Sequence, residues 1–187
     1  MAYLSENALK EMNFKSLGRG VKISDKASIY DAEQMYIGDF SRVDDFCVLS
    51  GKISIGRYCH VTPMCLIAGG QPGVEIRDFC TLAYGVKVFS QSDDYSGETM
   101  VSSLVPKKYK REFFASVLIE RQVIVGANSI ILPGVTVAEG CAIGAMTLVI
   151  KTTEPWGMYV GSPATWLKAR KKDLNELEQR FLEEEGR

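Results

Sequence analysis

A six-residue period of aliphatic residues constrains the fold of this chain more than any other feature. The period is unbroken in two stretches, Ile37, Val43, Leu49, Ile55, Val61, Ile67 and Ile119, Val125, Ile131, Val137, Ile143, Val149, with shorter runs at Ile23, Ile29 and at Ile76, Leu82, Val88. It fits neither the 3.6-residue period of a helix nor the two-residue period of an ordinary strand. It predicts an all-β parallel β-helix, whose three-faced coils point these residues inward and stack as parallel sheets.

A second set of positions, four residues after the aliphatic ones, is occupied by small residues. All five cysteines fall in this set, at Cys47, Cys59, Cys65, Cys80 and Cys141, and no two of them form a CxxC pair. A buried free cysteine behaves as a small apolar residue. We therefore interpret the cysteines as part of the inner wall, and expect neither disulfides nor a metal site.

Charge and hydropathy restrict the partners of the chain. The net charge of −1 gives no electrostatic argument for nucleic-acid binding. No apolar stretch of about 18 residues is present, and the N-terminal segment lacks the apolar core of a signal peptide. We expect a cytoplasmic protein that does not insert into a membrane.

Breaks in the period divide the chain into three parts. Residues 1–22 are expected to cap the first coil, with a short helix over 5–14. The β-helix should span residues 23–152 and carry an inserted loop at 90–116, where the period is absent. Residues 153–187 should form a terminal segment with a helix from about 164 to 185. A long excursion from a compact repeat is more often functional than not.

Two segments near the end of the chain point to a known family. IVGANSIILPGVTVAEGCAIGAMTLVIK and the following YVGSPATWLKARK resemble the terminal coils of hexapeptide-repeat acyltransferases. The resemblance implies left-handed coils, a homotrimer with sites between subunits, and acetyl-CoA as co-substrate in a groove beside the coils. It implies backbone contacts to the cofactor at Gly126, Ala127 and Ala145, and phosphate contacts at Lys151, Arg170 and Lys171. Met146 and Ile150 depart from the usual pattern, which weakens a side-chain role there.

The single histidine is the candidate general base, or else the group that orients the acetyl carbonyl. Acyl transfer needs a group with a pKa near neutrality, and the histidine usual in the loop of this family is missing, with Asp93 near its place. His60 stands just before an inward residue, so its ring should point outward. One coil of 18 residues places it over Arg42, and the next coil places Thr81 over it.

The residues around His60 and in the loop complete the candidate site. We assign a catalytic role to His60 and to Asp93 or Asp94, whose carboxylate would hold the acceptor amine. The candidate substrate-binding residues are Arg42, Asp44, Asp45 and Tyr95. A carboxylate attracts an ammonium group, and a free amine is nucleophilic without strong activation. The arrangement therefore favours an amine acceptor over a hydroxyl.

The segments RVDDFCVLSG, SDDYSG and EPWGMYVGSPA resemble a branch of this family that serves bacterial surface polysaccharides such as O-antigen. The branch includes enzymes that acetylate dTDP-4-amino-4,6-dideoxyglucose, so the resemblance implies N-acetylation of a nucleotide-linked amino sugar. Two alternatives remain: O-acetylation of a sugar hydroxyl, as in galactoside or maltose acetyltransferases, and a non-catalytic scaffold. A γ-type carbonic anhydrase needs three metal-binding histidines, which one histidine excludes.

Overall fold

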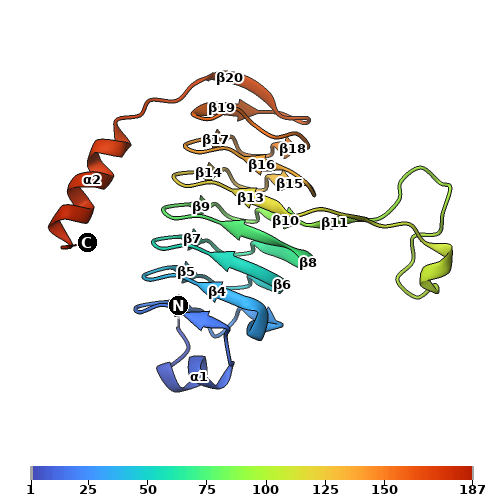
Figure 1. Ribbon diagram of the computed structural model, residues 1–187, viewed down its shortest axis with the longest axis horizontal. Helices are drawn as coiled ribbons and strands as arrows, with labels where there is room; N and C mark the ends of the chain where they lie inside the picture. Colours follow the sequence, from blue (N-terminus) through green and yellow to red (C-terminus); the bar gives the residue numbers. More distant parts are fainter. Residues whose placement is uncertain (1, 187) are drawn as a thin grey trace.

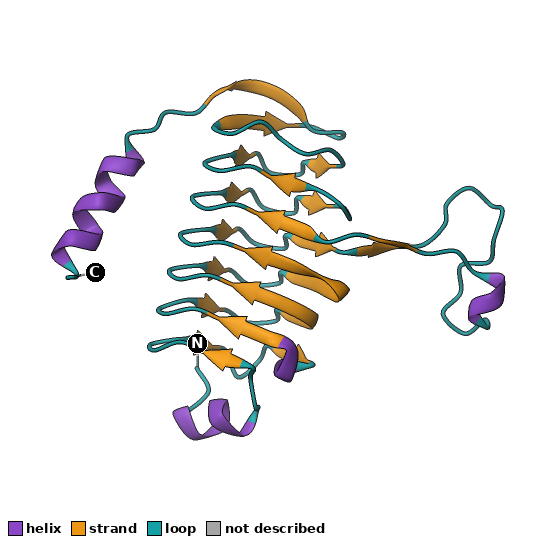
Figure 2. Cartoon of the chain, in the orientation of Figure 1, coloured by secondary structure: helices purple, strands orange, loops and turns teal. Residues whose placement is uncertain are grey.

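The computed structural model describes residues 2–186 as a stack of coils with three attachments (Figure 1). A short helix closes the N-terminal end of the stack, and a long arm projects sideways from its middle. At the other end the chain crosses the last coil and turns back, so that the C-terminal helix lies beside the stack (Figure 2). The predicted fold, a left-handed parallel β-helix of hexapeptide repeats, is confirmed.

The strands form three parallel faces, and β6 and β8 continue around the corner between the second and third faces. The first face contains β2 (Lys22–Ile23), β5 (Arg42–Val43), β7 (His60–Val61), β9 (Thr81–Leu82), β14 (Ile124–Val125), β17 (Ala142–Ile143) and β19 (Gly157–Val160). The second contains β3 (Ser28–Tyr30), the starts of β6 (Val48–Ile55) and β8 (Leu66–Ile76), β10 (Lys87–Phe89), β15 (Ile130–Ile131) and β18 (Leu148–Val149). The third contains β1 (Ser16–Leu17), β4 (Met35–Ile37), the ends of β6 and β8, β13 (Val117–Ile119) and β16 (Thr136–Val137).

The inward positions are those that the six-residue period predicts. Every aliphatic residue of the two long series is at most 2% exposed, and together they form one continuous core. Burial of each such side chain contributes about 1.5–3 kcal/mol, which repays the ordering of these very short strands. Ile29 is the exception because it lies near the end of the stack, where it is half-buried.

The five cysteines are free and buried in the inner wall, as predicted. Two pairs stack in neighbouring coils, Cys47 with Cys65 and Cys59 with Cys80. The neighbouring Cys65 thiol raises the pKa of Cys47, and burial acts in the same direction. A raised pKa disfavours the reactive thiolate at Cys47, and the burial of all five side chains in the wall fits a packing role.

The six-residue period is interrupted by two extra residues between Ile29 and Ile37, by three between Ile67 and Ile76, and by the loop at 90–116. Each interruption has a structural counterpart. The short 3₁₀ helix η1 (Ala32–Gln34) fills the first one, and the second is a widened corner within β8. Residues 90–116 form the arm, which leaves the stack through an antiparallel pair, β11 (Gln91–Ser92) and β12 (Phe113–Phe114), and contains the 3₁₀ helix η2 (Lys107–Tyr109).

The N-terminal helix α1 (Glu6–Glu11) begins at Ser5, whose hydroxyl accepts a hydrogen bond from the Ala8 amide at 3.2 Å. Such a cap satisfies one of the free amides of the first turn. Leu9 is buried against the first coil. The predicted cap helix is confirmed. Strand β1, which also lies within residues 1–22, already belongs to the stack, because it pairs with β4.

The expected helix from residue 164 was wrong over its first part. Residues Thr165–Ala169 form strand β20, which pairs antiparallel with β19. The physical reason is the open edge of the last coil: β20 supplies the hydrogen bonds that a further coil would have provided. Trp166 packs edge-on against Tyr159, with ring centroids 5.6 Å apart. The helix α2 begins only at Leu174 and ends at Glu184.

Helix α2 is held by an aromatic column along one corner of the stack. Phe40, Tyr58 and Phe79 occupy equivalent corner positions in three coils, and adjacent rings stack 5.2 Å apart. Phe181 of α2 meets Tyr58 and Phe79 edge-on, at 5.1 and 6.3 Å. The buried Glu178 pairs with Arg121 of the same corner. Among the described residues, no helix has the length and apolar character needed to cross a membrane.

Candidate active site

The predicted stacking around His60 is confirmed on the first face. Arg42 of β5, His60 of β7 and Thr81 of β9 are direct partners in neighbouring parallel strands. Each is followed by an inward aliphatic residue, so the three side chains stand in one outward row. The Arg42 and His60 side chains remain 41% and 33% exposed.

Asp44 contacts both Arg42 and His60 from the buried side of the row. Its side chain is 2% exposed, and its Oδ2 lies 2.7 Å from His60 Nε2. Arg42 Nε lies 3.0 Å from Asp44 Oδ1, and Arg42 Nη2 donates to Oδ2 at 3.2 Å. Arg42 Nε also donates to His60 Nε2 at 3.1 Å, and Arg42 Nη2 lies 2.7 Å from the same nitrogen. A buried carboxylate thus contacts both of these partly exposed side chains.

Asp45 is turned away from this cluster. It accepts a hydrogen bond from the Ser24 hydroxyl at 2.5 Å and pairs with Lys26 at 3.4 Å, both in the preceding coil. The Ser24 hydroxyl holds the pKa of Asp45 below its usual value, and Lys26 acts in the same direction. Its present contacts bind two coils together, and its predicted role in substrate binding stays a prediction.

The three residues predicted to line the cofactor groove lie at one corner. Gly126 and Ala127 follow β14, Ala145 follows β17, and Met146 N donates to Ala127 O at 2.8 Å. A Cβ atom at Gly126 would stand 2.4 Å from the Ala145 amide nitrogen. Glycine is therefore required here for the close approach of two coils. The corner is the one that carries Asp44 lower in the stack.

The distance from His60 to this corner follows from the strand order β7–β9–β14 on the first face. Neighbouring strands lie about 4.8 Å apart, so two steps amount to roughly 10 Å.

Of the three residues predicted to contact phosphates, Lys151 and Lys171 are exposed. Arg170 differs, because its Nη1 donates to the carbonyls of Gln122 and Gly140 at 2.7 and 2.9 Å. Burial lowers the pKa of its guanidinium. Its hydrogen bonds hold the terminal segment against the coils.

Asp94 organises the arm. One of its carboxylate oxygens accepts the Ser96 amide at 2.9 Å, and the other accepts the Thr99 hydroxyl at 2.8 Å. Arg111 pairs with it at 3.3 Å. The hydrogen bonds from Ser96, followed by those from Thr99, lower the pKa of Asp94 to about 2. Its side chain is 8% exposed, so it is committed to the loop that carries it.

Asp93 lines a groove of about 540 Å³ between the root of the arm and the second face. Tyr95 and Glu112 line it too, opposite the outward apolar residues of β6, β8, β15 and β18. Lys110 is 7% exposed and places its ammonium 3.7 Å from Asp93 Oδ1 and 3.3 Å from Glu112 Oε1. The sequence analysis missed Lys110 and Glu112, because a KKYKRE segment has the composition of an ordinary solvated loop.

One chain does not bring His60 and Asp93 together. His60 belongs to the first face, and the arm that carries Asp93 leaves the end of β10 on the second face. The arm extends away from the stack (Figure 1). Its Tyr95 and Leu104 are each 92% exposed. The arm thus exposes large apolar side chains on its surface.

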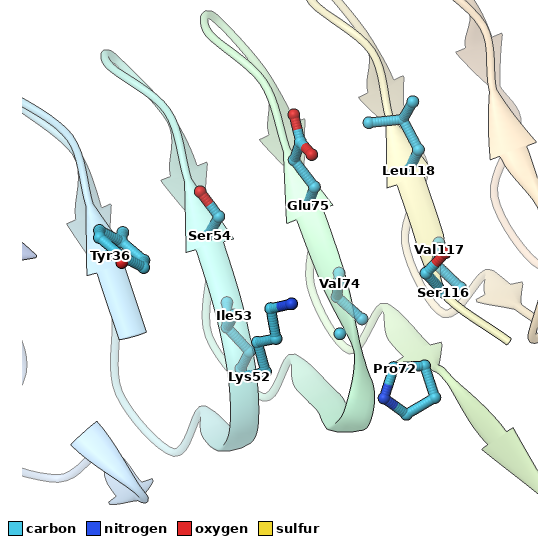
Figure 3. Close-up of a pocket in the computed structure, with 11 residues that line it drawn as sticks. Tyr36, Lys52, Ile53, Ser54, Pro72, Val74, Glu75, Ser116, Val117 and Leu118 are labelled. Atoms are coloured by element: carbon cyan, nitrogen blue, oxygen red, sulfur yellow. The ribbon is translucent and has the colours of Figure 1, made fainter. Parts of the chain in front are cut away.

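A further groove of about 530 Å³ lies on the third face (Figure 3). Tyr36, Ser54, Glu75 and Leu118 stand in a row on β4, β6, β8 and β13, with Lys52 and Pro72 at one end. None of the residues assigned to catalysis lines it. Its open form and ordinary side chains fit a packing surface better than a reaction centre.

The fold is the β-helix of hexapeptide repeats in which the sequence resemblance predicts an acyltransferase. No model of a protein family matches the sequence. The chain is 43% identical over 184 residues to the dTDP-4-amino-4,6-dideoxy-D-glucose acyltransferase of Escherichia coli, covering 97% of this chain and 95% of the relative. It therefore belongs to the family of that acyltransferase.

Solved structures agree with this assignment. AntD, an N-acyltransferase from Bacillus cereus solved with dTDP and 3-hydroxybutyryl-CoA, superposes with a TM-score of 0.97 at 40% identity, over 99% of this chain and 98% of that one. A hexapeptide-repeat acetyltransferase from Vibrio cholerae, solved with acetyl-CoA, has a TM-score of 0.59 at 17% identity, over 89% of this chain and 76% of that one. The second likeness concerns the fold alone.

Proposed function

We propose that this protein transfers an acetyl group from acetyl-CoA to the amine of a nucleotide-linked amino-deoxy sugar of the dTDP-4-amino-4,6-dideoxyglucose type. The observation that carries the proposal is the similarity to the Escherichia coli acyltransferase over nearly the whole of both chains. The near-complete superposition with AntD supports it, because that protein was solved with dTDP and an acyl-CoA. The product would serve surface-polysaccharide synthesis, such as that of O-antigen, in the cytoplasm.

The reaction is balanced by one proton transfer. The amine attacks the thioester carbonyl, a C–N bond forms, and the C–S bond breaks to release coenzyme A. One proton leaves the nitrogen and one reaches the sulfur, so a single base can carry it between them. His60 is the candidate for this step, because it is partly exposed and has a carboxylate behind it.

We further propose a homotrimer in which each site uses two subunits. The separation of His60 from the arm within one chain supports this arrangement, as does the exposure of the apolar residues on the arm. The arm of one subunit would reach the first face of its neighbour and place Asp93 and Tyr95 opposite His60 and Arg42. Coenzyme A would then lie along the corner of Gly126, Ala127 and Ala145, with Lys151 and Lys171 near its phosphates.

The activity is tested by thiol release from acetyl-CoA. We expect release with dTDP-4-amino-4,6-dideoxyglucose and none with the matched sugar that bears a hydroxyl at C4, because only the amine is nucleophilic without strong activation. The product mass should rise by one acetyl group. Release with the hydroxyl sugar alone would instead support O-acetylation, and no release with either would support a scaffold. Parallel assays with 3-hydroxybutyryl-CoA would define the acyl group.

The two arm aspartates should differ on substitution. Asp93→Asn is expected to raise KM for the amino sugar about 10–100-fold, since a hydrogen bond to a charged group contributes roughly 1.5–3 kcal/mol. Asp94→Asn should make the arm more sensitive to limited proteolysis, because it removes the carboxylate that binds Ser96, Thr99 and Arg111. An unchanged KM for Asp93→Asn would remove that residue from the acceptor site.

A further inference from the structure

Lys110 differs from its neighbour Arg111 in the arm. The side chain of Lys110 is 7% exposed, whereas that of Arg111 is 61% exposed. A lysine is almost never buried unless it is paired. The Lys110 ammonium donates to Glu112 Oε1 at 3.3 Å and lies 3.7 Å from Asp93 Oδ1. One nearly buried ammonium thus contacts two carboxylates.

Both carboxylates line the groove at the root of the arm, and Lys110 does not. Asp93 is 48% exposed and Glu112 26%, so a ligand in the groove meets the carboxylates and has no direct contact with the ammonium. Among the described residues that line the groove, Tyr95 is the remaining titratable one, and the strands contribute no charged side chain. Asp93, Glu112 and Lys110 therefore set the charge of the groove, and together they carry one negative charge.

An amine acceptor requires two opposite properties of such a groove. A carboxylate binds the amine best in its protonated form, as an ammonium group. An ammonium group has no lone pair with which to attack a thioester, so the reactive form is the free amine. A nearby negative charge favours the protonated form, and a nearby positive charge favours the free base. Two carboxylates without a cation would bind the amine and keep it unreactive.

We propose that Lys110 is a positioning residue, whose ammonium holds Asp93 and Glu112 and offsets part of their charge, so that the bound amino group can lose its extra proton. The inference rests on the proposed function, in which Asp93 contacts the acceptor amine. Two cations on one carboxylate lie within the range, about 4–6 Å, over which a like charge disfavours the protonated form. The substrate ammonium gives one proton to water at the open groove, and the free amine then forms the C–N bond. The overall reaction therefore releases one proton to solvent.

Lys110→Met removes the ammonium and keeps a long side chain. We expect the limb of the kcat–pH profile that rises with pH to move about one unit higher, because kcat reports protonation in the enzyme–substrate complex. At a pH on that limb, kcat should fall about tenfold. KM for the amino sugar should not rise, since the groove has gained negative charge. Steady-state thiol release across a range of pH measures both quantities.

Glu112→Gln tests the same balance in the opposite direction. It removes a negative charge and keeps Lys110, so the profile should move to lower pH and KM for the amino sugar should rise. The double variant with Lys110→Met and Glu112→Gln has the net charge of the native groove, and we expect it to recover the native profile. Two substitutions that only disturbed the packing of the arm would not compensate each other.

The matched control is Lys108→Met, because Lys108 is an exposed lysine of the same segment. It should keep the native profile. A native profile in both Lys110→Met and Glu112→Gln would overturn the proposal, as would a double variant that is slower than either single one.

A nitrogen-15-labelled amino sugar provides a readout without turnover. In the complex with the protein and no acetyl-CoA, the nitrogen chemical shift of the amine follows its protonation. We expect the amine to remain protonated to a higher pH in Lys110→Met than in the native protein. If it did so while the native protein transferred no acetyl group, the role of Lys110 would stand and the proposed function would fail. If the native protein were active and the two titrations coincided, the proposed function would stand and the role of Lys110 would fail.

Discussion

Replacing His60 with alanine is expected to lower kcat for acetyl transfer by about 10²–10⁴-fold, the usual contribution of a positioned base. The reason is that, of the three clustered side chains, the imidazole alone changes its protonation easily near neutral pH. Arg42 stays charged, and Asp44 is buried behind it. KM for acetyl-CoA should change little, since the predicted cofactor corner lies two coils away from β7. The measurement is steady-state thiol release.

Two further variants make this result specific. His60→Gln keeps a side chain that can donate to Asp44 or to the acetyl carbonyl, but it cannot carry a proton. We expect it to be as slow as alanine if His60 is a base, and close to native if the ring only orients the carbonyl. Lys22→Ala alters the same outward row one strand below Arg42 and should keep native turnover. Native turnover in His60→Ala would contradict the assignment.

Replacing Gly51 with alanine is expected to destabilise the β-helix by about 3 kcal/mol or more. Gly51 has a φ of +76°, and it lies in β6 beside Gly70 of β8. A Cβ atom there would stand 2.4 Å from the Gly70 amide nitrogen, which is backbone and cannot move aside. Two coils would have to separate at the corner from which β6 and β8 continue onto the third face. Urea-induced unfolding measures the loss.

Gly97 in the arm separates the two causes of destabilisation, which are the backbone strain of a positive φ and the steric clash with the next coil. It has a similar φ of +83°, but a Cβ atom added to it would meet nothing within 4 Å. Gly97→Ala therefore carries the backbone strain alone, on the order of 1 kcal/mol. If Gly51→Ala were no more destabilising than Gly97→Ala, the close approach of the coils at this corner would not matter for stability.

The β-helix was predictable because its information is local and repeated. Each inward aliphatic residue contacts its equivalents one coil away, so a six-residue period is enough to assign face and burial. Arg42 and His60 were found in this way, because they are one coil of 18 residues apart, and Thr81 followed once the three extra residues between Ile67 and Ile76 were counted. The arm was found as an interruption of the same period.

The ends of the stack were less predictable for the same reason. Residues 165–169 have no repeated neighbour, and their conformation depends on the open edge that they cover. A helical pattern and a strand on an exposed edge are difficult to distinguish in so short a segment. Arg170 was expected near phosphates. It instead donates to the backbone carbonyls of Gln122 and Gly140, at the corner beside α2.

The sequence by itself determined the coil, its inward wall of aliphatic and cysteine residues, and the row in which His60 stands. Only the tertiary structure decided which partners the polar side chains beside that row have. Asp44 and Asp45 are adjacent and chemically alike, yet one is buried against Arg42 and His60 and the other binds Ser24 and Lys26. The six-residue period specifies which residues turn inward, whereas the partner of a corner side chain depends on the three-dimensional contact between coils.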